Sequence, residues 1–256
     1  MSPWFLSGDA GSQAPVRIFC FPHGGGDPRG YLTWQPALAP VAELLVVCAP
    51  GRAHRFAEPP PASIGELAIG AADAISAHAD RPVILFGHSF GALVAFEAAR
   101  LLRDTPAVRG LVLSGCVAPA LMPTEYLVWA AGLTGREFAE MAGKYEGLAP
   151  EIVADEELQE LLLPGLRADL RLIAEYRYRP AAPLALTGTL INGRDDWHVA
   201  DSTIDGWRRE FSAPPDRHWH PGGHFYFDDH PAAVLDTLTA LASDVDISTD
   251  QHVEVI

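Results

Sequence analysis

Lysine is almost absent from this sequence: Lys144 is the only one, so nearly all of the positive charge is carried by arginine. Lysine and arginine together number 18 against 33 aspartates and glutamates, which leaves a formal net charge of −15. A strongly negative chain is repelled by phosphate backbones and by anionic lipid surfaces. The composition therefore argues against nucleic acid or a membrane as a partner.

Cysteine is also scarce, and no hydrophobic run is long. Cys20, Cys48 and Cys116 each lie in or beside an apolar run, which predicts three small buried side chains and neither a disulfide framework nor a metal site. No apolar stretch reaches the length of a membrane span, and the N-terminus lacks the pattern of a signal peptide. We therefore expect a cytoplasmic protein.

Short apolar runs alternate with helix-like stretches along most of the 256 residues. This alternation predicts a single α/β unit with a mostly parallel central sheet flanked by helices. Strands are expected at 16–21, 44–48, 83–86, 111–113, 189–192 and 217–220, and helices at 64–75, 92–102 and 231–241. Ser63 and Glu66 have the spacing of a capping box for the first of these helices. Residues 1–14, and those from about 244 onward, are expected to be loosely held.

The region 117–182 interrupts the alternation, because it carries helix-like segments and no strand signal. Thr134 with Glu137 suggests another capping box, Pro164 is expected at a helix start, and three apolar residues follow at helical spacing: Leu166, Leu170 and Ile173. We predict a core of residues 1–116 and 183–256, with 117–182 as a helical lid insertion over the functional site. The simpler alternative is that these apolar faces only pack against the core.

The segment Gly87-His88-Ser89-Phe90-Gly91 lies between an expected strand and an expected helix. A Gly-x-Ser-x-Gly motif in that context is the nucleophile elbow of the α/β-hydrolase fold, in which glycines relieve crowding around a strained serine. Ser89 is therefore the predicted nucleophile.

A serine nucleophile needs a histidine base and a carboxylate that orients it, and this fold supplies them in the order Ser, acid, His. The late histidines are His198, His218, His220, His224, His230 and His252. His224 is preferred because Gly222-Gly223-His224 follows the last expected strand. The acid should follow the preceding strand, where Asp195 and Asp196 are adjacent, and the usual Gly-x-x-Asp spacing from Gly193 favours Asp196.

Two backbone N–H groups must stabilise the oxyanion of such a reaction. One donor is normally the residue after the nucleophile, here Phe90. The other is expected from His23-Gly24-Gly25-Gly26, with Gly24 preferred and Gly25 second. A plain glycine-rich turn is the alternative, whereas a phosphate loop would need a Lys-Ser/Thr pair that does not follow.

Six pieces of this chain resemble the type II thioesterases that accompany polyketide synthases and nonribosomal peptide synthetases. They are Cys20–Gly26, Ala49-Pro50-Gly51-Arg52, Phe86–Ala92, Leu166-Arg167-Ala168-Asp169, Glu175-Tyr176 and Gly222-Gly223-His224-Phe225. The resemblance supports Ser89, His224 and Asp196 as the catalytic residues. Three positions depart from the family pattern: Gly24 replaces a usual alanine, Phe90 a usual methionine and Trp197 a common proline.

The resemblance implies hydrolysis of acyl thioesters held on the phosphopantetheine arm of an acyl or peptidyl carrier protein, which removes aberrant or stalled chains. The enzyme itself is then expected to need no cofactor or metal and to act as a monomer. Chemistry alone leaves two alternatives, a small-molecule carboxylesterase and a carrier-protein-binding module with vestigial activity. Four arginines in or near the lid are candidates for carrier docking, or form the solvated side of a helix: Arg167, Arg171, Arg177 and Arg179.

Overall fold

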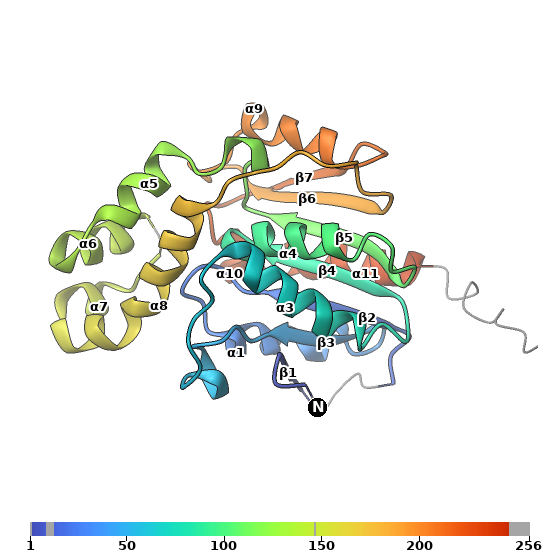
Figure 1. The fold of residues 1–256 in the computed structure, drawn as a ribbon, viewed down its shortest axis with the longest axis horizontal. Helices are drawn as coiled ribbons and strands as arrows, with labels where there is room; N and C mark the ends of the chain where they lie inside the picture. Colours follow the sequence, from blue (N-terminus) through green and yellow to red (C-terminus); the bar gives the residue numbers. More distant parts are fainter. Residues whose placement is uncertain (1, 9–12, 146, 246–256) are drawn as a thin grey trace, which may run out of the picture.

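The computed structural model describes residues 2–8, 13–145 and 147–245, and a seven-stranded sheet forms its centre (Figure 1). The strand order is β1-β3-β2-β4-β5-β6-β7, and all neighbours pair in parallel except β1 with β3. The strands are β1 Phe5–Ser7, β2 Val16–Phe21, β3 Ala42–Val47, β4 Val83–His88, β5 Val108–Ser114, β6 Thr187–Gly193 and β7 Asp216–His220. All six predicted strands are confirmed, as is the mostly parallel α/β-hydrolase sheet.

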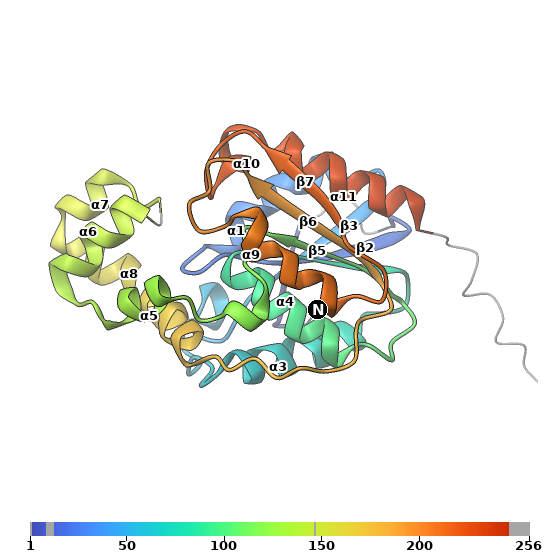
Figure 2. The ribbon, with the colours of Figure 1, turned by 90° about the horizontal axis from the view of Figure 1, so that it is seen from above.

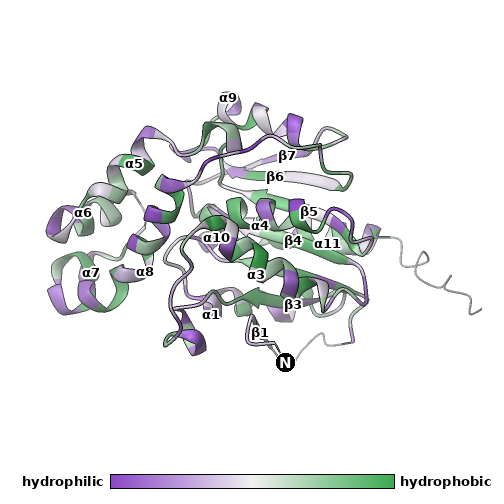
Figure 3. Cartoon of the chain, in the orientation of Figure 1, coloured by the Kyte–Doolittle hydropathy of each residue, from purple (hydrophilic) through white to green (hydrophobic). Residues whose placement is uncertain are grey.

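Helices cover both faces of this sheet, which explains why the central strands β2, β3, β4 and β5 are mostly apolar and buried (Figure 2). Phe19 and Phe21 of β2 pack in the cluster that contains α3 (Ile64–Ser76) and α4 (Phe90–Leu101). Ile18 and Cys20 pack on the opposite face, in the cluster with α11 (Ala232–Asp244). The hydropathy colouring shows the resulting apolar strands at the centre of the molecule (Figure 3).

The helices of the sheet layers are α1 Pro28–Tyr31, α2 Gln35–Leu38, α3 Ile64–Ser76, α4 Phe90–Leu101, α9 Asp201–Ile204, α10 Tyr226–Asp229 and α11 Ala232–Asp244, with 3-10 turns η1 Leu32–Trp34, η2 Ala53–Arg55, η3 Pro119–Leu121 and η4 Asp205–Glu210. The three helices predicted for the sheet layers, at 64–75, 92–102 and 231–241, are confirmed as α3, α4 and α11, whereas the short helices α1, α2, α9 and α10 were not predicted. The Ser63 hydroxyl accepts the Glu66 N–H at 3.0 Å and caps α3 as predicted, while the Glu66 carboxylate accepts the N–H of Ala62.

Four further helices lie between β5 and β6, and the described residues of this region form no strand (Figure 1). They are α5 Glu125–Gly132, α6 Gly135–Tyr145, α7 Pro150–Ala154 and α8 Glu156–Glu175. The boundaries of a lid at 117 and 182 stay a prediction.

The expectation that Pro164 starts a helix is wrong, because Pro164 lies inside α8. The helix begins one residue after Asp155, whose carboxylate accepts the N–H groups of Glu157 and Leu158. Proline removes one backbone donor and disturbs the helix locally. Here the strong cap and the packing of the apolar face outweigh that cost.

The prediction of a loosely held N-terminal segment is also wrong in part. Phe5–Ser7 form an edge strand, β1, that pairs antiparallel with β3, and the Phe5 side chain is buried against Phe19. The frayed end predicted after 244 falls mostly on 246–256, outside the described residues. Cys20, Cys48 and Cys116 are all buried, as predicted. Among the described helices, none combines the length and apolar character needed to span a bilayer.

Candidate active site

Ser89 occupies a strained turn between β4 and α4. Its backbone angles are φ 54° and ψ −118°, a conformation that non-glycine residues rarely adopt. A Cβ atom on Gly87 would overlap the carbonyl of Gly91, and one on Gly91 would overlap the carbonyl oxygens of Phe21 and Pro22. The two glycines are therefore required by close backbone contacts, which is the physical basis of the motif.

The loops after β2, β4, β6 and β7 meet at one edge of the sheet, because parallel strands present their carboxyl ends together. They surround a pocket of about 200 Å³ whose lining includes Gly24, Ser89, Phe90 and His224. Helix α8 covers the same pocket with the three apolar residues predicted for that role, Leu166, Leu170 and Ile173.

His224 and Asp196 form a buried pair beside this pocket. The Nδ1 atom of His224 lies 2.8 Å from Oδ2 of Asp196, and the other carboxylate oxygen accepts the backbone N–H of His198 at 2.9 Å. Asp196 is 4% exposed, whereas the neighbouring Asp195 is exposed and donates its backbone N–H to the carbonyl of Gly222. Of the two adjacent aspartates, Asp196 is therefore the one whose side chain contacts His224.

The remaining histidine candidates occupy other positions. His198 packs against His224 with ring centres 4.7 Å apart, His218 and His220 lie on β7, and His230 follows α10. His252 lies outside the described residues.

The loop after β2 places Gly24 next to Phe90, the two predicted oxyanion donors. A Cβ atom on Gly24 would lie 3.6 Å from the Cβ of Phe90 and 3.6 Å from Leu166. The second candidate, Gly25, donates its N–H to the Asp169 carboxylate at 2.8 Å, so that donor is already engaged. This geometry favours Gly24.

Sequence reasoning did not assign a role to Arg52 or Asp169, although both belong to pieces that carry the family resemblance. Their side chains form a largely buried ion pair between the loop after β3 and α8. The pair contacts the oxyanion loop through Gly25. The two motifs that contain Arg52 and Asp169 were visible in the sequence. The contact between the two side chains could not be inferred, because the residues are 117 positions apart.

Two further histidines pack around His224 and favour the neutral state. Burial lowers the pKa of His23 to about 4, with smaller effects from positive charge at His224 and Arg52. Burial also lowers the pKa of His88 well below its usual value, and its Nδ1 lies 2.9 Å from the Ser114 hydroxyl. Near neutral pH, His23 and His88 therefore add no positive charge next to His224.

Aromatic side chains line one side of the pocket. Tyr126 of α5 meets Trp197 edge to face at 4.6 Å between ring centres, and both line the pocket. Trp197 is 51% exposed and directly follows Asp196. Trp197, one of the three residues that depart from the family pattern, thus forms part of the pocket wall where α5 meets the loop after β6.

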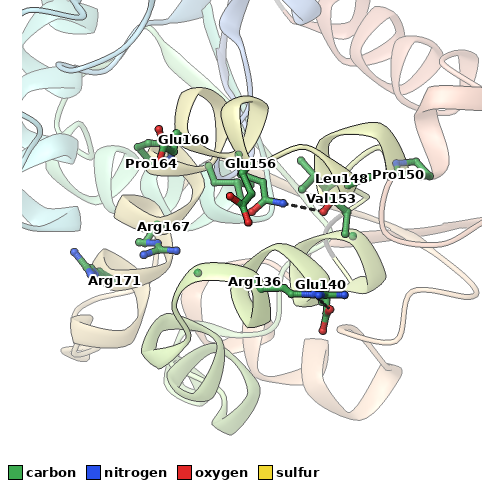
Figure 4. A pocket seen from close by; sticks show the side chains of 15 residues that line it. Arg136, Glu140, Leu148, Pro150, Val153, Glu156, Glu160, Pro164, Arg167 and Arg171 are labelled. Carbon is green, nitrogen blue, oxygen red and sulfur yellow. Dashed lines mark hydrogen bonds and ion pairs between the residues drawn. The ribbon is translucent and has the colours of Figure 1, made fainter.

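A second, wider groove of about 1200 Å³ lies among α6, α7 and α8, and its lining includes none of the residues predicted for the catalytic triad or the oxyanion hole (Figure 4). Arg167 and Arg171 line it together with Glu140, Glu156 and Glu160. The Arg167 guanidinium lies over the Phe138 ring of α6 and makes a cation–π contact there. Because the lining carries both signs of charge, the groove is not a purely basic surface.

Residues 16–241 match the family model for the thioesterase domain. The chain is 34% identical over 229 residues to the thioesterase PikA5 of Streptomyces venezuelae, covering 88% of this chain and 80% of that protein. It is also 34% identical over 240 residues to LgrE of Brevibacillus parabrevis, named a linear gramicidin dehydrogenase, covering 91% and 90%. Among solved structures, the type II thioesterase BorB from the borrelidin biosynthetic cluster superposes with a TM-score of 0.83 at 33% identity, covering 93% of this chain and 97% of that one.

Although LgrE is named as a dehydrogenase, the matching family model, PikA5 and BorB are all described as thioesterases. These relatives give no support to a small-molecule carboxylesterase or to a carrier-binding module with vestigial activity. The chain belongs to the thioesterase family and is a type II thioesterase of the kind found in polyketide and nonribosomal peptide pathways, an enzyme that hydrolyses acyl thioesters.

Proposed function

We propose that this thioesterase cleaves acyl groups from the phosphopantetheine arm of a carrier protein, with Ser89 as nucleophile, His224 as base and Asp196 as the orienting acid. The observation that carries the assignment is the buried His224–Asp196 pair at the pocket that also contains Ser89. With Nδ1 held by the carboxylate, the Nε2 atom of His224 is the one left for the serine.

The reaction then proceeds in two steps. The Oγ atom of Ser89 bonds to the thioester carbonyl carbon while His224 takes the hydroxyl proton, and the oxyanion is met by the N–H groups of Gly24 and Phe90. The carbon–sulfur bond breaks and the thiol leaves with the proton from His224. A water molecule, deprotonated by His224, then attacks the acyl ester, releasing the carboxylic acid and restoring Ser89. These steps use no metal and no cofactor beyond the arm that the substrate carries.

The pocket favours short acyl groups. Its volume of about 200 Å³ lies below the range of about 300–1,000 Å³ that is usual for sites of drug-sized ligands. Leu93, Val117 and Leu127 add to the apolar lining that α8 provides. An apolar wall discriminates weakly between chains that differ by one methylene, so the preference should be broad within this short range. Motion of the lid helices stays a prediction.

The carrier protein remains the proposed partner, in the cytoplasm, with the enzyme acting as a monomer. Three free, buried cysteines suit a reducing compartment. Arg167 and Arg171 stay candidates for docking. The guanidinium of Arg177 donates to the carbonyls of Ala174 and Tyr176, so its side chain is partly engaged within the chain. Arg179 accepts from Arg100 through its backbone carbonyl, and its side chain stays a candidate for docking.

The decisive experiment compares turnover of the same short acyl group on a carrier protein, on coenzyme A and on nitrophenol. The proposal predicts the highest kcat/KM for the carrier-bound thioester. Equal kcat/KM for the acyl carrier protein and for acyl coenzyme A would show that the enzyme does not recognise the carrier protein itself. If kcat/KM for the nitrophenyl ester exceeded that for the thioesters by more than its greater chemical reactivity explains, the proposed preference for thioesters would be contradicted.

A further inference from the structure

The carboxylate of Asp169, on the lid helix α8, holds the backbone of the loop after β2. Its Oδ2 atom accepts the N–H of Gly25 at 2.8 Å, a contact between residues 144 positions apart. The same oxygen accepts from Nη2 of Arg52, which also donates to the carbonyl of Gly165 at 2.9 Å. One oxygen thus connects the lid helix, the loop after β3 and the oxyanion loop.

Close packing surrounds this contact. A Cβ atom on Gly25 would lie 2.8 Å from the Cβ of Leu166, and one on Gly24 would lie 3.7 Å from the Cβ of Asp169. Gly25 itself has a φ of 74°, a conformation open to glycine at little cost. The oxyanion loop therefore rests directly on one turn of α8, and a side chain at Gly25 would separate them.

Electrostatics explain why an arginine accompanies the acid. Asp169 is 8% exposed, and burial raises the pKa of its carboxyl, while Arg52 and the Gly25 N–H oppose that effect. A lone carboxylate beside the oxyanion loop would also repel the negative charge that forms there. The Arg52 guanidinium supplies the compensating charge and leaves Asp169 able to accept hydrogen bonds.

We infer that Asp169 is a positioning residue of the reaction, which fixes the peptide between Gly24 and Gly25 so that the Gly24 N–H faces the oxyanion. The inference rests on the proposed function, because an oxyanion forms only if Ser89 attacks the thioester carbonyl. It assigns no contact between Asp169 and the substrate. Its effect belongs to the transition state, since the oxyanion exists only there. Displacing a group that acts on the reacting atoms by about 1 Å can cost about 10²-fold in rate.

The test compares Asp169→Ala, Asp169→Asn and Tyr176→Phe. Tyr176 follows α8 and donates its hydroxyl to Glu97 at 2.6 Å, so its variant cuts another contact between α8 and the core without touching the oxyanion loop. We expect Asp169→Ala to lower kcat about 10²-fold at nearly constant KM. Asp169→Asn, whose amide oxygen still accepts from Gly25, should recover most of that loss, and Tyr176→Phe should keep the wild-type kcat.

The rate of covalent labelling by a fluorophosphonate gives a second readout, because the labelled serine carries a tetrahedral adduct whose oxygen occupies the oxyanion position. Labelling should slow in Asp169→Ala and stay unchanged in Tyr176→Phe. If Asp169→Ala does not fold, Asp169→Ser replaces it, since its side chain is too short to reach Gly25, and the same loss is expected.

Equal labelling and equal kcat in wild type and the Asp169 variants would overturn the inference, as would matching losses in Asp169→Ala and Tyr176→Phe. A wild-type enzyme that is neither labelled nor active would instead overturn the proposed serine mechanism. The two failures are thus separate results of one experiment.

Discussion

The Nδ1 atom of His224 lies 2.8 Å from Oδ2 of Asp196, although 28 positions separate the two residues in the chain. Asp196 follows β6 and His224 follows β7, and the parallel pairing of these strands sets the two loops side by side. The Cβ that any other residue would add at Gly193 would overlap the carbonyls of Gly222 and Gly223, so the loops are in direct backbone contact. The parallel pairing of β6 and β7 and this backbone contact therefore hold the proposed acid and base next to each other.

Replacing Ser89 with alanine should abolish thioester hydrolysis while the fold is kept. Loss of the nucleophile of such a triad costs on the order of 10⁶ in kcat. Steady-state turnover of an acyl-carrier thioester, with circular dichroism as a control for folding, measures the effect. Retention of more than a few per cent of the activity would contradict covalent catalysis by Ser89.

Asp196→Asn and Asp195→Asn form a matched pair for the orienting acid. Asparagine at 196 favours the wrong tautomer of His224, and the expected loss in kcat is about 10⁴-fold. Asp195→Asn should leave kcat within about twofold, because the Asp195 side chain is exposed and only its backbone N–H bonds to the second loop. The opposite ranking of the two kcat values would assign the role to Asp195.

Gly91→Ala should lower the free energy of unfolding by about 3 kcal/mol, at the upper end of the usual cost of overpacking. The added methyl group would meet the carbonyl oxygens of Phe21, the last residue of β2, and of Pro22 directly after it, and this backbone cannot move aside cheaply. Gly132→Ala is the control, since an added Cβ there has no atom within 4 Å among those described. Urea unfolding measures both variants, and equal stability of the two would contradict the steric account of the motif.

Stability should fall as the pH is lowered from about 6.5 to about 4. Folding holds the pKa of His23 at about 4 against an ordinary value of 6.5, so in this window the unfolded chain binds a proton that the folded chain does not. One such group contributes at most about 1.4 kcal/mol per pH unit. His88, with its pKa also lowered by burial, acts in the same direction.

His23→Gln should therefore reduce the slope of unfolding free energy against pH in that window, measured by urea unfolding at several pH values. His218→Gln, at an exposed position on β7, is the control and should leave the slope unchanged. An unchanged slope in His23→Gln would show that His23 does not stay neutral in the folded protein.

Leu170→Ala should shift the acyl preference toward longer chains, because Leu170 lines the pocket. Leu172→Ala is the matched control: Leu172 is buried on the same helix but is not part of the pocket lining. Both should cost about 2–5 kcal/mol of stability, as large-to-small core changes do. Profiles of kcat/KM against acyl length check the prediction, and a similar shift in both variants would assign the effect to loosening of α8.

The sequence by itself determined the sheet and the elbow, and it selected Ser89 and His224 as the candidates for nucleophile and base. These depend on local properties: strands buried on both faces must be apolar along their whole length, and Gly87 is required by its close approach to the Gly91 carbonyl within the same turn. The capped start of α3 at Ser63 is local as well. Such signals are contained within a few neighbouring residues and can be read without knowing the rest of the fold.

The tertiary structure alone decided the features that depend on distant partners. Three residues are too few to give a recognisable strand pattern in the sequence. β1 forms because its backbone pairs with the edge strand β3. Pro164 is tolerated inside α8 because the helix is capped at Asp155 and packs over the pocket. The contact of Asp169 with Gly25 joins two ends of a long stretch of chain, and no local pattern encodes it. These outcomes are settled by packing and by hydrogen bonds formed only when the whole chain has folded.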